Sequence, residues 1–252
     1  RDLVRSRGLG DVYKRQQENN DELGYTNFMM DMLNEGTNKY SSLEFDSILG
    51  SLGSNIGFGS DLDTSFVSVS SLKSNLDQTL DLAKEAVMFP TFPSNEIARI
   101  KKQTLAAFKR DEFRASSIAF RNIGKLLYGD DHPYGKLLIG AGVSETIQNI
   151  NAEKLSDLHK RALNPQNLTF TVAGDISIDE IVGLLESKFG NWKSESGSNL
   201  KDLPTMPLPE KRKVYLINKP NAEQSYIVAG QLLPPTATAV SYTHLRAHET
   251  VL

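Results

Sequence analysis

The apolar residues between positions 24 and 37 recur at the spacing of one face of a helix. Phe28, Met29, Met32 and Leu33 form this repeat, and residues three and four apart lie on the same side of an α-helix. Gly36 follows at a position where glycine takes a left-handed conformation without cost. The pattern therefore predicts a helix with one buried stripe that ends in a turn at Gly36.

The same periodicity predicts helices over most of the chain up to residue 189. Ser41 with Glu44, and Ser177 with Glu180, have the spacing of a capping box. In that arrangement each side chain satisfies a backbone N–H group at the start of the helix. The expected helices span residues 41–53, 75–89, 94–113, 117–127, a short segment from 144, 151–163 and 177–189.

Alternation of apolar and polar residues predicts strands between these helices. The glycine-rich residues 54–61 favour a plain loop, and the alternative is an edge strand over 56–60 that receives another chain. Strands separated by helices indicate an α/β or α+β sandwich, in which helices pack on a sheet. The expected strands, of which the first has one solvated face, span residues 64–71, 167–173, 214–217 and 225–231.

The composition excludes several classes of function. The chain has 252 residues, which allows one large domain or two small ones. A net charge of −3 gives no reason to expect nucleic-acid binding. The absence of cysteine rules out disulfides and thiolate metal sites. No apolar run reaches the ~18 residues of a transmembrane helix, so we expect no membrane span.

Both ends of the chain differ in character from the rest. Residues 1–16 carry five basic and two acidic side chains without a clear period, and residues 240–252 are equally irregular. Both resemble translated sequencing adapters at the ends of environmental sequences, as in a metagenomic fragment. We therefore interpret them as non-native segments outside the fold. The head, residues 1–16, has a net charge of +3, and the tail, residues 240–252, has a net charge of 0. Residues 17–239 therefore carry a net charge of −6.

The histidines do not indicate a catalytic or metal site. His244 and His248 are four residues apart, as in zinc-binding helices, and Glu249 follows. The glutamate does not lie between the histidines and no third ligand can be identified, so we predict no metal site. We interpret His132 as a residue that fixes a turn, because no serine or cysteine partner pattern lies nearby. We interpret His159 as structural.

Residues 193–211 have the composition of a linker, rich in serine, glycine, lysine and proline. We therefore expect a first domain over residues 17–192 and the start of a second domain over residues 212–239. In this interpretation the native segment is cut at both of its ends.

From about residue 22 to 236 the chain resembles one repeat of the insulinase/pitrilysin family of zinc peptidases. The resemblance implies an α+β fold with an antiparallel or mixed sheet and helices packed largely on one face. The landmarks that carry it, in order, are residues 32–37, 49–53, 75–77, 90–93, 128–135, 173–175 and 224–225.

The catalytic positions of that family are substituted in this chain. Active members have His-x-x-Glu-His where residues 27–31 lie here, and a later glutamate as third zinc ligand. Asn27 and Asp31 replace the two histidines, Met30 replaces the base, and Ala107 replaces the third ligand. A thioether cannot accept the proton of an attacking water, and these side chains lack three firm zinc ligands. The resemblance therefore implies a segment without metal that is not catalytic on its own.

The resemblance implies the non-catalytic half of a zinc endopeptidase, like the C-terminal half of bacterial periplasmic members. Such a half closes the chamber and helps to hold extended peptide opposite an active half, which carries the zinc and belongs to the same chain or to a separate subunit. The resemblance also implies a bacterial periplasmic or cell-envelope protein with a peptide partner. In the family, an edge strand pairs with the substrate by β-augmentation. In this sequence that edge maps to Asn55, Ile56, Gly57, Phe58 and Gly59.

Two alternatives remain open at the level of sequence. Inactive relatives serve as structural subunits of a larger complex related to processing peptidase. An active metallopeptidase with atypical ligands would have to use Asp31, Glu35 or His132, although their spacing forms no recognisable catalytic group. A His-x-x-Glu-His repeat upstream in the same reading frame would favour the non-catalytic half.

Overall fold

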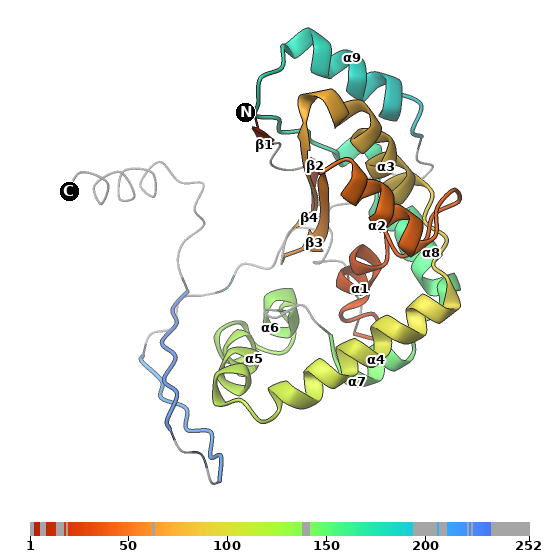
Figure 1. Cartoon of the computed structure of the whole chain (residues 1–252). Helices are drawn as coiled ribbons and strands as arrows, with labels where there is room; N and C mark the ends of the chain where they lie inside the picture. Colours follow the sequence, from red (N-terminus) through yellow and green to blue (C-terminus); the bar gives the residue numbers. More distant parts are fainter. Residues whose placement is uncertain are drawn as a thin grey trace, which may run out of the picture.

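The computed structural model describes residues 3–5, 9–13, 18, 20–61, 64–137, 142–193, 206, 211–220, 222 and 224–232. Within these ranges, an antiparallel sheet and the helices that cover it form an α+β body (Figure 1). The expected fold class is confirmed. The tail and most of the expected linker lie outside the described residues.

The helices follow the predicted periodicity, and one short helix, α6, was not predicted. Two 3₁₀ turns, at Lys73–Asn75 and Pro165–Asn167, accompany them. The α-helices are α1 (Tyr25–Asp31), α2 (Ser42–Ser51), α3 (Leu76–Met88), α4 (Ser94–Asp111), α5 (Ala115–Tyr128), α6 (Pro133–Leu137), α7 (Ser144–Gln148), α8 (Ala152–Ala162) and α9 (Ile178–Phe189).

The capping box at the start of α2 is confirmed. The Ser41 hydroxyl accepts from the backbone N–H of Glu44 at 3.4 Å, and the Glu44 carboxylate accepts from the backbone N–H of Ser41 at 2.9 Å. The bond from the Ser41 backbone lowers the pKa of Glu44. At α9, Ser177 accepts from the backbone N–H of Glu180 at 3.3 Å, so the serine half of the predicted capping box forms there. Local sequence alone therefore fixes both helix starts.

The strands are β1 (Leu3–Arg5), β2 (Leu9–Tyr13), β3 (Asn55–Ser60) and β4 (Thr64–Leu72), and β4 lies at the centre of the sheet. β3 pairs antiparallel with β4 from Asn55 opposite Ser70 to Ser60 opposite Ser65. β1 and β2 pair antiparallel with β4 as well. Because β3 fills one edge of β4 along this length, β1 and β2 share the other edge.

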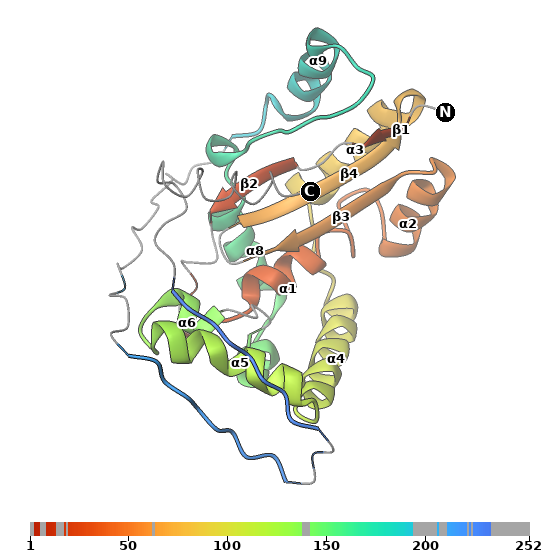
Figure 2. The ribbon, with the colours of Figure 1, turned by 90° about the vertical axis from the view of Figure 1, so that its left-hand side faces the viewer.

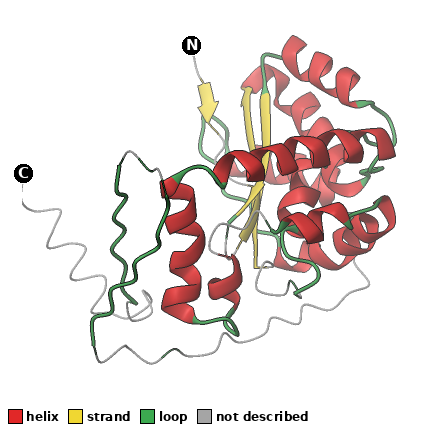
Figure 3. Ribbon diagram, turned by 90° about the horizontal axis from the view of Figure 1, so that it is seen from below, coloured by secondary structure: helices red, strands yellow, loops and turns green. Residues whose placement is uncertain are grey.

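The two faces of β4 differ as its alternation predicted. Residues 65, 67, 69 and 71 are buried toward the helices, whereas Phe66 and Leu72 on the other face are exposed. Figure 1 shows α1, α2, α3 and α8 on one side of the sheet, and Figure 3 shows the strands edge-on between helices and open space. The alternation therefore determines which face the helices cover.

The expectation that residues 1–16 take no part in the fold is wrong for β1 and β2. Both strands pair with β4, in registers such as Leu3 opposite Leu72 and Leu9 opposite Val67. An open edge of a central strand offers backbone N–H and C=O groups to any extended segment nearby, whatever its side chains. The sequence pattern therefore gave no sign of this pairing, and the non-native origin of the head stays a prediction.

β3 corrects the preferred interpretation of the glycine-rich segment as a loop. A Cβ atom on Gly59 would lie 2.7 Å from the Phe66 ring, and one on Gly57 would lie 2.8 Å from the Ser68 hydroxyl. Both partners lie directly opposite on β4. The glycines therefore make room for side chains that cross over the strand, which is a role of glycine in strand interiors.

Gly36 has a different role from the one its sequence position suggested. The positive φ angles among the described glycines belong to Gly24, Gly53, Gly129 and Gly142, so the left-handed assignment of Gly36 is wrong. A Cβ atom on Gly36 would lie 2.6 Å from the Pro93 ring. The glycine is required by close packing against the loop before α4, which no local pattern reveals.

The core surrounds α1, which is buried on nearly every side. The predicted stripe is confirmed, because Phe28, Met29, Met32 and Leu33 are at most 2% exposed. Met30 is also fully buried, so the helix lies inside the domain rather than at its surface. α2 adds one fully buried side chain, Phe45, to the same core.

Three predicted strands are wrong. Residues 168–173, 214–217 and 225–231 are extended but form no strand, apart from a one-residue bridge at position 170. A strand needs a neighbour that pairs over several residues, and alternation alone does not supply one. Figure 2 shows the last of these segments, residues 225–231, as extended chain that passes close to α5, and the ring centroids of Phe120 and Tyr226 lie 6.1 Å apart there. The Lys219 ammonium donates to the Phe113 carbonyl at 2.6 Å, which ties this region to the end of α4.

Candidate functional site

A cleft of about 390 Å³ lies where α1, β3 and α4 meet. Its lining comes from three parts of the chain that are far apart in sequence. α1 and the turn after it give Asp31, Asn34 and Glu35, β3 gives Ile56 and Phe58, and α4 gives Ile100, Gln103 and Thr104. The lining therefore combines three apolar side chains with five polar ones.

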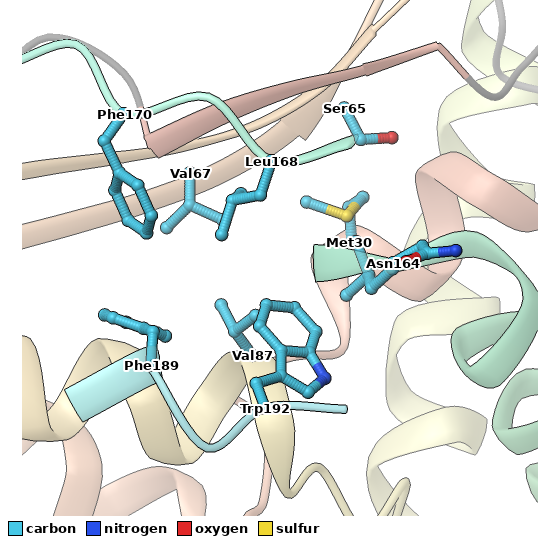
Figure 4. A pocket seen from close by; sticks show the side chains of 10 residues that line it. Met30, Ser65, Val67, Val87, Asn164, Leu168, Phe170, Phe189 and Trp192 are labelled. Carbon is cyan, nitrogen blue, oxygen red and sulfur yellow. The ribbon is translucent and has the colours of Figure 1, made fainter. Parts of the chain in front are cut away.

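The substituted catalytic positions on α1 do not converge on one point. Asn27 is half-buried, and its side-chain oxygen accepts from the Ser60 hydroxyl at 3.0 Å, so it joins α1 to the end of β3. Met30 is fully buried and lines a separate apolar cavity of about 20 Å³ with Val67, Val87 and other core residues (Figure 4). Asp31 is exposed at the cleft.

The position expected for the third zinc ligand holds a side chain without a donor atom. Ala107 is half-buried on α4, one turn after Gln103 and Thr104. In the part of the chain that the structure describes, no group of three His, Asp or Glu side chains is placed to hold a metal ion. An amide, a thioether and a methyl group at three of the four positions also do not match the nitrogen and oxygen ligands of a zinc peptidase. These residues therefore do not fit the zinc ion of active peptidases.

An ion-pair network braces one wall of the cleft. The Arg99 guanidinium donates to Glu35 and to Glu96, and the Ser42 hydroxyl donates to Glu35 at 2.8 Å. The bond to Glu35 is the largest cause that raises the pKa of Arg99, followed by the bond to Glu96. The network joins the turn after α1 to α2 and α4, so it holds the cleft in shape.

The predicted substrate-binding residues form an edge strand beside this cleft. Ile56 and Phe58 face the helices and line the cleft, whereas Asn55, Gly57 and Gly59 belong to the opposite face. Within the described residues β3 pairs only with β4, so its other edge borders the cleft without a strand partner. The structure thus brings this predicted segment together with Asp31, and it separates Met30 from both.

The two described histidines have structural roles, as predicted. The backbone N–H of Tyr134 donates to His132 Nδ1 at 3.1 Å, and the His132 ring stacks on Tyr128 with centroids 5.0 Å apart. His159 Nε2 lies 2.7 Å from the Val87 carbonyl oxygen, and its ring meets Phe92 edge-on. Neither histidine lines the cleft.

Sequence reasoning missed the contribution of α4 to the site. Ile100, Gln103 and Thr104 line the cleft, and Arg99 braces it. The periodicity of this segment predicted only a helix over residues 94–113. Ile100 and Thr104 are four residues apart, so the pattern places them on one side of the helix, but it does not reveal the cleft that they border.

Comparison with known families assigns this fold. The family model described as Insulinase (Peptidase family M16) matches residues 15–139, and the one described as Peptidase M16 inactive domain matches residues 149–249. The chain belongs to the insulinase family, M16. The second match extends into residues 240–252, so the boundary at residue 239 stays a prediction.

Curated relatives from this family are similar over most of the chain. An uncharacterized zinc protease of Rickettsia felis is 26% identical over 186 residues, which cover 72% of this chain and 43% of the relative. A protein of Helicobacter pylori called non-peptidase homolog YmxG is 23% identical over 181 residues, which cover 72% of this chain and 40% of the relative. The chain therefore spans less than half the length of these M16 relatives.

Solved M16 structures share the fold. The peptidase M16 inactive domain from Pseudomonas fluorescens superposes with a TM-score of 0.72 at 27% identity, covering 82% of this chain and 48% of that one. The periplasmic protease PqqL from Escherichia coli superposes with a TM-score of 0.70 at 20% identity, covering 79% of this chain and 22% of that one. The second likeness shows that the same fold forms part of a larger M16 protein.

No helix among the described residues is long and apolar enough to cross a membrane.

Proposed function

We propose that this chain is a non-catalytic part of an M16 peptidase, which helps to close a chamber and to hold extended peptide opposite an active half. That active half carries the zinc, in the same chain or in a separate subunit, and the protein acts in the bacterial periplasm or cell envelope. The observation that carries the proposal is the β3 edge beside a cleft, in a chain whose substituted catalytic positions supply no set of zinc ligands.

Several findings support this proposal. The Pseudomonas fluorescens structure is described as an inactive domain, and the Helicobacter pylori relative as a non-peptidase homolog. PqqL is described as a periplasmic protease. An edge strand binds an extended peptide through main-chain hydrogen bonds, with little dependence on peptide sequence. A structural subunit would instead bury the same β3 edge permanently against a partner.

The purified chain is expected to hold well below one zinc ion after dialysis, because Asn27, Met30 and Ala107 do not supply ligands. Metal analysis by mass spectrometry measures this. A His248→Ala variant serves as the matched control, since His244 and His248 in the tail have zinc-binding spacing. One equivalent of zinc retained by both proteins would contradict the assignment of a non-catalytic segment.

An extended peptide is expected to bind β3 through alternate backbone amides. A strand offers the N–H groups of every second residue to one neighbour, so N-methyl groups placed on one alternate set of a peptide should block binding. Loss of three hydrogen bonds at about 1 kcal/mol each weakens affinity on the order of a hundredfold. A peptide with N-methyl groups on the other alternate residues should bind as well as the unmodified peptide. Fluorescence polarisation measures these affinities.

Hydrogen exchange locates the bound peptide. The amides of Asn55–Ser60 should gain protection when the unmodified peptide is added, while those of the distant helix Ile178–Phe189 should not change. If the two N-methylated peptides bound with equal affinity, binding would not use a strand edge. The absence of binding by every peptide would overturn the proposed function.

A further inference from the structure

Two lysines from different helices converge on the end of α7, where this short helix leads into α8. The Lys101 ammonium on α4 donates to the Gln148 carbonyl at 2.9 Å. The Lys154 ammonium on α8 donates to the Asn149 carbonyl at 3.0 Å. α7 packs against α4 (Figure 1). Because the two carbonyls belong to consecutive residues, the two positive charges are held near each other.

These two charges have no acidic partner within the described part of the chain. The ion pairs found there include neither ammonium. Burial lowers the pKa of Lys101, and the charge of Lys154 lowers it further. Lys154 also lies in the first turn of α8, where the helix dipole disfavours a cation, and Glu153 in the same turn does not pair with it. An anion beside both ammoniums would relieve these costs.

A buried tyrosine hydroxyl adjoins the same lysines. Tyr25 is 2% exposed, and its hydroxyl accepts from the Lys154 ammonium at 3.3 Å. Among the described residues no acceptor is found for the proton of this hydroxyl. A buried donor without an acceptor is costly, so a ligand that accepts this proton would be favoured.

The donors left at this place suit the oxygen atoms of a phosphate group. An ammonium has three N–H donors. With respect to the described residues, Lys101 uses one and Lys154 uses two, so three N–H groups and the Tyr25 hydroxyl are left to donate. Lysine binds phosphate as a point charge, and hydrogen bonds between two charged groups are stronger than neutral ones.

We infer that Lys101, Lys154 and Tyr25 form a binding site for a phosphate group, carried by the free ion or by a phosphomonoester. None of the three lines the cleft beside β3, so the inference does not depend on the proposed function. The bound group would link α4 to α8 and, through Tyr25, to the first residue of α1. It therefore stabilises the packing of these helices.

Thermal unfolding of the full chain in sodium phosphate, and in sodium chloride of equal ionic strength, tests the site. A phosphate concentration of about 10 mM should raise the unfolding midpoint by about 3 °C, as expected for a Kd on the order of 1 mM. Glycerol 3-phosphate carries the same group as a monoester and is measured in the same way. A larger shift with the ester identifies a phosphomonoester as the ligand, and an equal or smaller shift identifies the free ion.

Substitutions locate the bound phosphate. Lys101→Gln and Lys154→Gln should each weaken phosphate binding about tenfold in isothermal titration, as expected for the loss of one charge-assisted hydrogen bond. Lys154→Arg keeps the charge and the N–H donors, so it should retain binding. Lys160→Gln, an equal charge change at an exposed position on α8, should leave binding unchanged.

Two results would overturn the site. Equal midpoints in phosphate, in the ester and in chloride would show that the lysines hold no phosphate group. If Lys160→Gln weakened binding as much as Lys154→Gln, the effect would reflect the overall charge of the protein and not this cluster. Because the titration of the unchanged chain needs no substitution, a variant that fails to fold does not decide the outcome.

Discussion

Met30→Glu restores the residue of active M16 peptidases at the base position, and it is expected to lower the free energy of unfolding by about 3–5 kcal/mol. Met30 is fully buried in the core, with 0% of its surface accessible to solvent. The cavity beside it is lined by Val67, Val87, Leu163 and other residues that include no cation. A carboxylate placed there would lose its hydration without gaining an ion pair.

The matched control for this position is Met30→Leu. It keeps the volume and the apolar character of the side chain, so it should cost less than about 1.5 kcal/mol. Urea denaturation of the three proteins, followed by circular dichroism, measures both differences. If Met30→Glu proved as stable as Met30→Leu, the side chain at this position would have to reach solvent or the cleft. The separation of Met30 from the former catalytic centre would then be incorrect.

Phe45→Ala is expected to destabilise the chain by about 3–5 kcal/mol. Phe45 is fully buried, and it is the buried side chain through which α2 joins the core. Removal of the ring leaves a cavity and loses the transfer free energy of a large apolar group. Because α2 also supplies Ser42 to the Glu35 network beside the cleft, loosening of this helix should weaken peptide binding as well.

Leu43→Ala on the same helix provides the comparison for Phe45→Ala. Leu43 is 83% exposed, so its truncation should change the free energy of unfolding by no more than about 0.5 kcal/mol. Both variants remove a large apolar side chain from α2, and the main difference between the two sites is burial. Equal midpoints of urea unfolding for the two variants would contradict the placement of Phe45 in the core.

The M16 assignment changes the meaning of the cleft between α1, β3 and α4. The positions that the resemblance assigns to the zinc site are used differently here, because Asn27 bonds to Ser60 and Met30 packs into the core. Beside them, Arg99 between Glu35 and Glu96 braces the cleft. These contacts support the proposed binding of peptide and not zinc chemistry.

Much of the candidate site was accessible from the sequence because it depends on residue identity. Asn27, Met30, Asp31 and Ala107 could be placed in the family's pattern without coordinates, and their chemistry excludes a zinc peptidase centre. The resemblance also pointed to residues 55–59 as a substrate-binding edge, which stays a prediction. The lining by Ile100, Gln103 and Thr104 could not be predicted, since it requires the relative position of α4 and β3.

The sequence by itself determined the helices and their caps, because these depend on residues within one or two turns of each other. Ser41 with Glu44 is such a case, and so is the stripe of α1. Tertiary structure decided what depends on distant partners. Gly36 is required by Pro93, Gly59 by Phe66, and β1 and β2 exist because β4 has an open edge. Residues 167–173 alternate like a strand but lack a neighbour that pairs along their length, so residues 168–173 remain extended chain.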